Sequence, residues 1–482
     1  MYNWSTQQLT IFDEIINPTA PVLSIVATAG ASKTSSIVEG ISRAHATHSN
    51  LSVRYLVFGN APAAEAREAF DTNAIVSTLH SYAYHYTVRA YNLNRNIKQY
   101  LTWRDLHPSI RVPFGMSNLI IDYITGFCKS PYYSIQQYLQ ETFDDYNHIA
   151  LQKAEKFLDI MMSGAMCITH DFYLKLFHIE VMNGNIQLPF HDKVILEEAQ
   201  DLSRITLDIA KKIPTNQLIL IGDPNQAVFS FLGLVNGFAE FPDARVLHLS
   251  KSFRVSNKYA PAIQQFLRDY LEPDAEFIGN DYDTEEIITR GYLTRTNHEL
   301  LSHMIECDEL DISYRLVADT KIKQMFKLPL ALIYAKQGYQ QKDPTLKHLQ
   351  MDIDDYYTLS ESTRARTSLF AYLLDACSDS PDIIGAIKLI MNFSPEAIIS
   401  TYNSAEAHKK SNSTYVLATC HSVKGLTLDE VTLSDGLNET VSDIIAKPRN
   451  EWTSDDLSEL ALYFVGISRH RYKLNNATHL NL

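Results

Sequence analysis

Apolar runs alternate with helical patterns along much of the chain. Val22 to Val26 is an apolar run, and residues 35–45 after it have the spacing of a helix. Strands that alternate with helices in this way build parallel sheets in α/β proteins. We therefore predict a parallel sheet within residues 1–85 that resumes near Lys193 and ends at about Pro242.

A second alternating region begins at Arg245. Residues 291–296 read as a strand, and the region closes with strands at 415–420 and 430–433 and a helix at 455–468. A second parallel sheet is therefore expected in the C-terminal half of the chain.

Helical patterns without strands interrupt both regions. Residues 86–150 are rich in Tyr, Asn and Ile at helical spacing, and residues 364–377 and 381–393 place apolar side chains at i, i+3 and i+4. We predict four regions: a first α/β domain (1–85 and 151–244), its helical insertion (86–150), a second α/β domain (245–320 and 401–482) and its insertion (321–400).

The segment Ala27–Thr34, between the first strand and its helix, carries the most chemistry. It approaches the phosphate-binding pattern G-x-x-x-x-G-K-[ST], with Ala27 and Ser32 at the glycine positions. The backbone N–H groups of such a loop and the following helix N-terminus bind phosphate, Lys33 would reach the β- and γ-phosphates, and Thr34 would bind Mg²⁺. Taken alone, an ordinary strand-to-helix turn of small residues is an equal alternative.

Carboxylates follow an apolar strand in a second segment. Val194 to Leu196 is followed by Glu197, Glu198 and Asp201. Acids at the carboxyl end of a strand in an open α/β sheet can hold a metal and activate water. Acids after a strand also occur in solvated turns and helix caps, which is the alternative interpretation.

Further motifs follow in a fixed order along the whole chain. They occupy Trp4–Gln8, Tyr55–Ala66, Thr78–Tyr84, Thr169–Leu176, Leu218–Phe231, Leu247–Arg254, Thr419–Leu426 and Tyr463–Arg469. In this order they resemble the UvrD/Rep-like superfamily 1A DNA helicases and, within them, the F-box DNA helicase 1 branch. The resemblance implies an α/β fold with two RecA-like P-loop NTPase domains, parallel sheets flanked by helices, each domain with a helical insertion.

The resemblance assigns the nucleotide site. It implies the cofactors ATP and Mg²⁺, with the metal bound by Thr34 and Glu197. Glu198 would be the general base, Gln226 the γ-phosphate sensor, and Arg254 and Arg469 two arginine fingers. Lys33 and these four form the predicted catalytic set. The further ATP-binding residues would be Gln8, Ala29, Gly30, Ala31, Ser32, Ser35, Phe253 and Gly425.

The resemblance also assigns contacts to single-stranded DNA. Those residues would be His80, Tyr82, Phe229, Phe231, Arg295 and His421. For a single aromatic residue, core packing is the competing interpretation, because the chain has 27 Tyr and 21 Phe. The net charge of −14 argues against a general basic coat for DNA but permits a narrow groove with a few cations and stacking rings.

Several positions differ from the family pattern. Ser32 replaces a glycine, Glu197 replaces an aspartate, Thr427 replaces a glutamate, and His470 replaces an alanine. Two classes of function therefore stay open. One is a 3′-to-5′ DNA helicase or translocase that unwinds duplex or strips bound protein in replication, recombination or repair. The other is a DNA-binding subunit with an impaired ATPase site.

The remaining expectations concern the setting of the protein. Five scattered cysteines indicate a reducing compartment, and we expect no membrane segment and no secretory signal. The glutamine motif starts at Trp4, so we expect no F-box before it and a cytoplasmic enzyme of phage or bacterial type, an excised motor, or a nuclear one if eukaryotic. The expected partners are single-stranded and forked DNA and single-strand-binding or recombinase proteins, with the chain itself a monomer.

Overall fold

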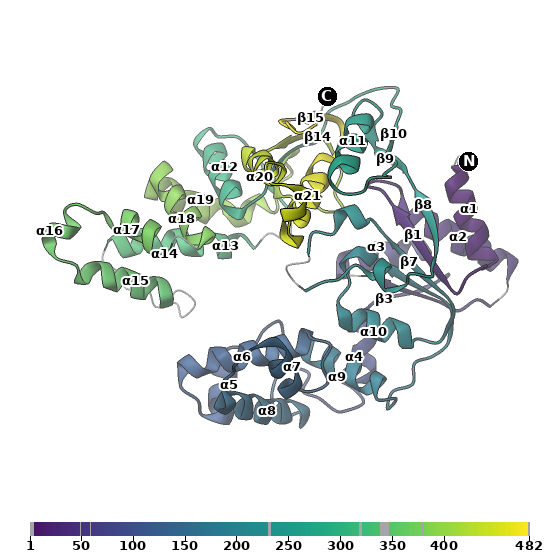
Figure 1. Ribbon diagram of the computed structural model, residues 1–482, viewed down its shortest axis with the longest axis horizontal. Coiled ribbons are helices and arrows are strands. Elements are labelled where there is room, and N and C mark those ends of the chain that lie inside the picture. The colour runs from purple at the N-terminus through teal and green to yellow at the C-terminus, as the bar shows by residue number, and fades with distance from the viewer. Residues whose placement is uncertain are drawn as a thin grey trace. The chain divides into compact units, whose positions relative to one another are not determined.

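The computed structural model describes residues 4–48, 50–57, 59–229, 233–317, 321–337, 347–377 and 380–480 (Figure 1). The chain divides into two units, residues 1–250 and residues 251–482. Each unit contains one large parallel sheet, a short two-stranded parallel pair, flanking helices and a helical insertion, so the predicted α/β fold class is confirmed.

Unit 1 is built on a six-stranded sheet with the order β3-β2-β6-β7-β1-β8 and parallel pairing throughout. The strands are β1 (Val22–Ala27), β2 (Val53–Val57), β3 (Ile75–Thr78), β6 (His191–Glu197), β7 (Thr215–Gly222) and β8 (Arg245–Leu249). The central strands are nearly continuous apolar runs because helices cover both faces of the sheet. Parallel pairing also brings the carboxyl ends of β1, β6 and β7 to one edge.

One face of this sheet is covered by the helices that follow its first strands. These are α1 (Thr6–Ile16), α2 (Lys33–Thr47) and α3 (Asn60–Phe70). Ile37 and Ile41 of α2 pack on Tyr55 and Ile195 of the sheet in a fully buried cluster. Figure 1 shows α1 and α2 side by side next to β1.

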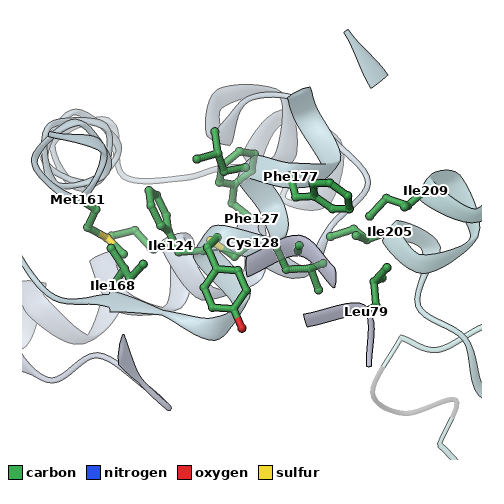
Figure 2. Packing of buried hydrophobic residues seen from close by; sticks show 14 of the residues in the cluster. Leu79, Ile124, Phe127, Cys128, Met161, Ile168, Phe177, Ile205 and Ile209 are labelled. Carbon is green, nitrogen blue, oxygen red and sulfur yellow. The ribbon is translucent and has the colours of Figure 1, made fainter. Parts of the chain in front are cut away.

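The other face is covered by α4 (Leu79–Tyr86), α9 (His170–Met182) and α10 (Arg204–Lys212). Behind them lies the first insertion, α5 (Trp103–Ile110), α6 (Phe114–Lys129), α7 (Ile135–Thr142) and α8 (His148–Met162), with the short parallel pair β4 (Ile97–Lys98) and β5 (Ile168–Thr169). Figure 2 shows one continuous core, in which Phe177 of α9 lies between Ile205 and Ile209 of α10 and Phe127 and Cys128 of α6.

Unit 2 contains a five-stranded parallel sheet with the order β12-β13-β11-β14-β15. Its strands are β11 (Arg290–Thr294), β12 (Arg315–Leu316), β13 (Tyr415–Thr419), β14 (Leu428–Leu433) and β15 (His470–Asn475). The helices α11 (Ala260–Tyr270), α12 (Asn297–Glu309), α20 (Asp435–Ile445) and α21 (Ser454–Ile467) flank it, and β9 (Lys251–Ser256) pairs with β10 (Ile278–Asn280) beside it.

The second insertion is helical throughout its described residues. It consists of α13 (Ile322–Met325), α14 (Lys327–Lys336), α15 (Lys347–Thr358), α16 (Glu361–Arg364), α17 (Leu369–Ala376), α18 (Pro381–Asn392) and α19 (Pro395–His408). Its core is continuous with Leu300 and Met304 of α12, which joins the insertion to the sheet. No single helix in the described parts of the chain is long and apolar enough to span a membrane, and α18 with α19 meets that criterion only as a pair bent by 113°.

Three predicted boundaries were wrong. Residues 245–249 form β8, which pairs with β1, so unit 1 ends after Ser250 and not at 244. The first insertion continues to Met162, because α8 packs on α6. The predicted helix 364–377 is divided, because Ser368 caps a new helix at Leu369.

Candidate nucleotide-binding site

The loop between β1 and α2 has the conformation of an anion-binding turn. Gly30 has φ 75° and Ser32 has φ 55°, both in the left-handed region. Thr28 N–H donates to the Leu249 carbonyl (2.9 Å), which ties the loop to the end of β8. Within the described residues no side chain caps α2, so its first N–H groups point to a site that a phosphate suits.

Lys33 lies between two carboxylates at this edge. Its ammonium is 3.6 Å from the Glu198 carboxylate, and it interacts electrostatically with Asp223 as well. A cation held by acids at a helix N-terminus is placed to exchange those partners for phosphate oxygens.

Thr34 and Glu197 contact each other directly. The Thr34 hydroxyl donates to the Glu197 carboxylate over 2.9 Å. Burial, followed by the charge of Glu198, raises the pKa of Glu197, while hydrogen bonds from Tyr55 and Thr34 oppose that shift. A hydroxyl beside a carboxylate is the oxygen donor set that Mg²⁺ takes together with phosphates. Tyr55 adds a buried hydroxyl beside this pair, and the three oxygen-bearing side chains together fit Mg²⁺.

Glu198 begins the segment after β6 in a left-handed conformation, with φ 52°. This turn separates its carboxylate from that of Glu197, and 31% of its side chain is exposed. Gln200 donates to it over 2.6 Å. The geometry leaves Glu198 accessible to water while Glu197 is buried, which divides base and metal ligand between adjacent acids.

Asp223 and Gln226 follow β7. The Gln226 amide donates to the Asp223 carboxylate, and Asp223 N–H donates to the Gln200 side chain (3.0 Å). Burial raises the pKa of Asp223 to about 6. Asp223, Gln200 and Tyr55 were missed as site residues, although all three lie in segments that the sequence had already singled out.

Gln8, predicted to contact adenine, is buried and hydrogen-bonded to other residues of unit 1. It forms a capping box with Ser5 at the start of α1, and its amide donates to Ser36 of α2 over 2.9 Å. The side chain is only 1% exposed. Gln8 therefore joins α1 to the helix after the phosphate loop, and its adenine contact stays a prediction.

The predicted arginine fingers meet within unit 2. Arg254 donates to the Ser468 carbonyl (3.3 Å) and to the Thr427 hydroxyl (2.8 Å). Arg469 donates to the Ser468 hydroxyl (3.0 Å) and to the Val465 carbonyl (2.9 Å). Burial lowers the pKa of Arg254 to about 10, and Arg469 is 2% exposed.

The similarity to known proteins agrees with this geometry. Residues 13–232 match the family described as "AAA domain". The chain is 22% identical to F-box DNA helicase 1 of Gallus gallus over 86% of its length and 43% of that protein. It is 29% identical to F-box DNA helicase protein 1 of Schizosaccharomyces pombe over 19% of its length and 10% of that protein.

These similarities support a relationship of the chain to the superfamily 1 helicases and, within them, to the F-box DNA helicase 1 branch. The chain spans less than half the length of these curated relatives.

Two further positions predicted to bind ATP, Phe253 and Gly425, belong to unit 2. Phe253 is 36% exposed, and the Lys251 ammonium lies 5.4 Å from its ring centroid. Gly425 has φ 92° in the turn before Thr427, a conformation that glycine adopts without strain. Their contacts with ATP stay predictions.

The helicase positions predicted to bind DNA in unit 1 differ in exposure. His80 is partly exposed and lies 3.9 Å from the Asp171 carboxylate, while Phe229 is half-buried. The expectation for Tyr82 was wrong, because its ring is 4% exposed and Arg54 covers it at 4.5 Å, so no base can stack there. Phe231 lies outside the described residues.

The two predicted DNA contacts in unit 2, Arg295 and His421, line one pocket of about 930 Å³ between the sheet edge and the second insertion. His298, Lys321 and Lys388 also line it. Arg295 is held there by a two-point pair with Glu459 (2.9 and 2.8 Å), so its guanidinium has a fixed orientation.

Proposed function

We propose that this chain is an ATP-dependent, single-stranded DNA translocase or helicase that moves 3′ to 5′. The observation that carries the proposal is the set of Lys33, Thr34, Glu197, Glu198 and Gln226, which share one sheet edge beside an uncapped helix N-terminus. This set contains every group that hydrolysis of a nucleoside triphosphate requires within one RecA-like domain.

The residues divide the work of hydrolysis. Lys33 neutralises charge on the phosphates, and the N–H groups of the loop and α2 hold their oxygens. Thr34 and Glu197 would hold Mg²⁺, which supplies charge neutralisation on the β- and γ-phosphates. Glu198 accepts the proton of the attacking water, and Gln226, fixed by Asp223, orients that water beside the γ-phosphate.

We also propose that the single strand binds against the pocket of unit 2. Arg295, His421, Lys321 and Lys388 supply cationic or hydrogen-bonding groups there within a chain whose net charge is −14. Local cations of this kind are sufficient for strand binding in a narrow groove. Unwinding of forks and removal of bound protein are the two outcomes of such movement.

The alternative function is DNA binding with an impaired ATPase site. Ser32 favours it, because a serine with φ 55° stands where the phosphate-loop pattern has glycine. Left-handed backbone strain of this kind is worth about 1 kcal/mol and a side chain there narrows the approach of phosphate.

Phosphate release measured with and without single-stranded DNA separates the two functions. We expect DNA to stimulate hydrolysis at least about tenfold and Glu198→Gln to abolish it while nucleotide still binds. DNA binding without hydrolysis above the Glu198→Gln background would contradict the motor and favour the binding subunit. Strand displacement from 3′- and 5′-tailed duplexes then tests polarity.

A further inference from the structure

The Tyr55 hydroxyl is an unusual feature of the candidate nucleotide-binding site, because it is a buried polar group. Tyr55 is fully buried, and among the described residues its hydroxyl has no hydrogen bond of good geometry. A buried hydroxyl whose hydrogen bonding is incomplete destabilises a protein, by up to about 1–3 kcal/mol where no bond forms. Phenylalanine would fill the same space without the free-energy cost of burying a hydroxyl, which suggests that the Tyr55 oxygen has a function.

The sheet register places this hydroxyl beside the predicted metal ligands. Tyr55 on β2 is paired with Ile195 on β6, so Tyr55, Ile195 and Glu197 project from the same face. The ring packs against Phe70, with ring centroids 4.7 Å apart, beneath the start of α2. Its oxygen therefore reaches the Glu197 carboxylate and the Thr34 hydroxyl.

Glu197 needs such support more than an aspartate would. Its side chain has one methylene more than the family's aspartate, and each additional rotatable bond must be fixed for the carboxylate to occupy one position. Thr34 donates to one oxygen, Oε1, over 2.9 Å. A second donor is required to fix the orientation of the whole carboxylate.

We propose that Tyr55 is a positioning residue whose hydroxyl holds the Glu197 carboxylate in the orientation from which Glu197 and Thr34 accept Mg²⁺. This inference rests on the proposed nucleotide site. Residues that orient metal ligands from the second layer change metal affinity by about 10- to 100-fold when they are lost. Tyr55 would let this chain use glutamate where shorter carboxylates are usual.

The test measures how Mg²⁺ changes nucleotide affinity, with a fluorescent ADP analogue titrated in EDTA and at increasing Mg²⁺. For Tyr55→Phe we expect the Mg²⁺ concentration at half-effect to rise about tenfold while affinity in EDTA stays within about twofold. The same Mg²⁺ dependence as the wild type, or an equal loss in EDTA, would overturn the inference. A wild type that binds no nucleotide would overturn the proposed function instead.

Tyr314→Phe is the matched control. Tyr314 is also fully buried, its hydroxyl also has no well-formed hydrogen bond in the described chain, and it also lies beside a carboxylate, Asp308. It belongs to unit 2, so its loss should leave the Mg²⁺ dependence unchanged. Thermal melting of both variants shows that each is folded.

A double-mutant cycle with Glu197→Asp links the hydroxyl to the longer side chain. Shortening the carboxylate withdraws it from Tyr55, so Tyr55→Phe should have little further effect, less than about twofold, in that background. Full additivity of the two changes would show that Tyr55 acts independently of Glu197 and would overturn the inference.

Discussion

The two units start from the same architecture, and they differ at the carboxyl edge of the sheet. In unit 1, β1 leads into α2 through two left-handed residues, and no described side chain caps that helix. In unit 2, β11 leads into α12 through Thr296, whose hydroxyl accepts from Glu299 N–H over 3.2 Å. One helix N-terminus is available to an anion, and the other is satisfied by its own chain.

The two units also differ in the charged side chains beside their sheets. Unit 1 places Glu197, Glu198 and Asp223 around Lys33, so a bound divalent metal would offset the excess negative charge. Unit 2 places Arg295 at its carboxyl edge, already paired with Glu459. Arg254 lies at the opposite edge, near the amino ends of β14 and β15, where it donates to Thr427 and Ser468. A parallel sheet thus provides a rim for binding, while the loop and its charges decide what binds.

The largest expected effect comes from Lys33. Lys33→Ala should lower DNA-stimulated hydrolysis by at least about 100-fold, because Lys33 is the cation at the start of α2 that would neutralise the phosphates. Steady-state phosphate release measures the loss. Lys211→Ala, which removes a surface partner of Glu240, is the control and should hydrolyse ATP like the wild type. Equal activity of both variants would place the nucleotide elsewhere.

The next largest expected effect is a difference between the two units in how their stability depends on pH. Burial raises the pKa of Asp223 to about 6 and lowers the pKa of His470 to about 4. Asp223 therefore binds more protons in the folded state, and its stabilising contribution is lost as the pH rises from about 4 to about 6. For His470 the unfolded state binds more protons, so stability is lost as the pH falls from about 6.5 to about 4.

Melting of two variants between pH 4 and pH 7 checks these signs. Asp223→Asn should raise the stability at pH 7 by about 1–3 kcal/mol while lowering hydrolysis, because Gln226 loses its charged acceptor. His470→Gln should reduce the acid sensitivity of unit 2 and leave nucleotide binding unchanged. Parallel pH profiles for the wild type and both variants would contradict the assignment.

Smaller effects are expected from substitutions at the N-terminal ends of α2 and α12. Ser32→Gly should stabilise unit 1 by about 0.5–1 kcal/mol and tighten nucleotide binding, since glycine adopts φ 55° without strain and opens the loop. Thr296→Ala should destabilise unit 2 by about 1 kcal/mol through the lost cap. Urea unfolding of the two variants measures both values. Destabilisation by Ser32→Gly would show that the serine has a bonding role at the site.

The sequence was sufficient for the features that local pattern encodes. Several strands of the two sheets (β1, β6, β11, β13 and β14), the phosphate loop and the two glutamates follow from apolar runs and motif spacing. Tyr55 lies in one of these motifs, but its role could not be found in this way, because it depends on the pairing of β2 with β6, which only the folded sheet defines. Tyr82 was misassigned for the same reason, since a tyrosine at helical spacing reads alike whether its ring faces the core or the solvent.

The strand β8 shows a further limit. Residues 245–249 lie directly before β9, so the sequence joins them to the following domain, yet β8 pairs with β1. Strand partners in a parallel sheet are distant in sequence, and no turn separates β8 from β9 to indicate the boundary. The domain border could therefore be placed only to within one strand.

The smallest effect concerns the pocket of unit 2. Lys388 of α18 and Lys321 lie on its rim and are exposed, so each should contribute mainly long-range attraction to the DNA backbone. Alanine at either position should weaken binding of oligo(dT) by about two- to fivefold and reduce the salt dependence by about one counterion, equally for all sequences. Lys336→Ala, on α14 outside the pocket lining, is the control. If Lys388→Ala leaves the salt slope unchanged, the strand does not pass the pocket, and the edge of unit 2 serves structure rather than DNA.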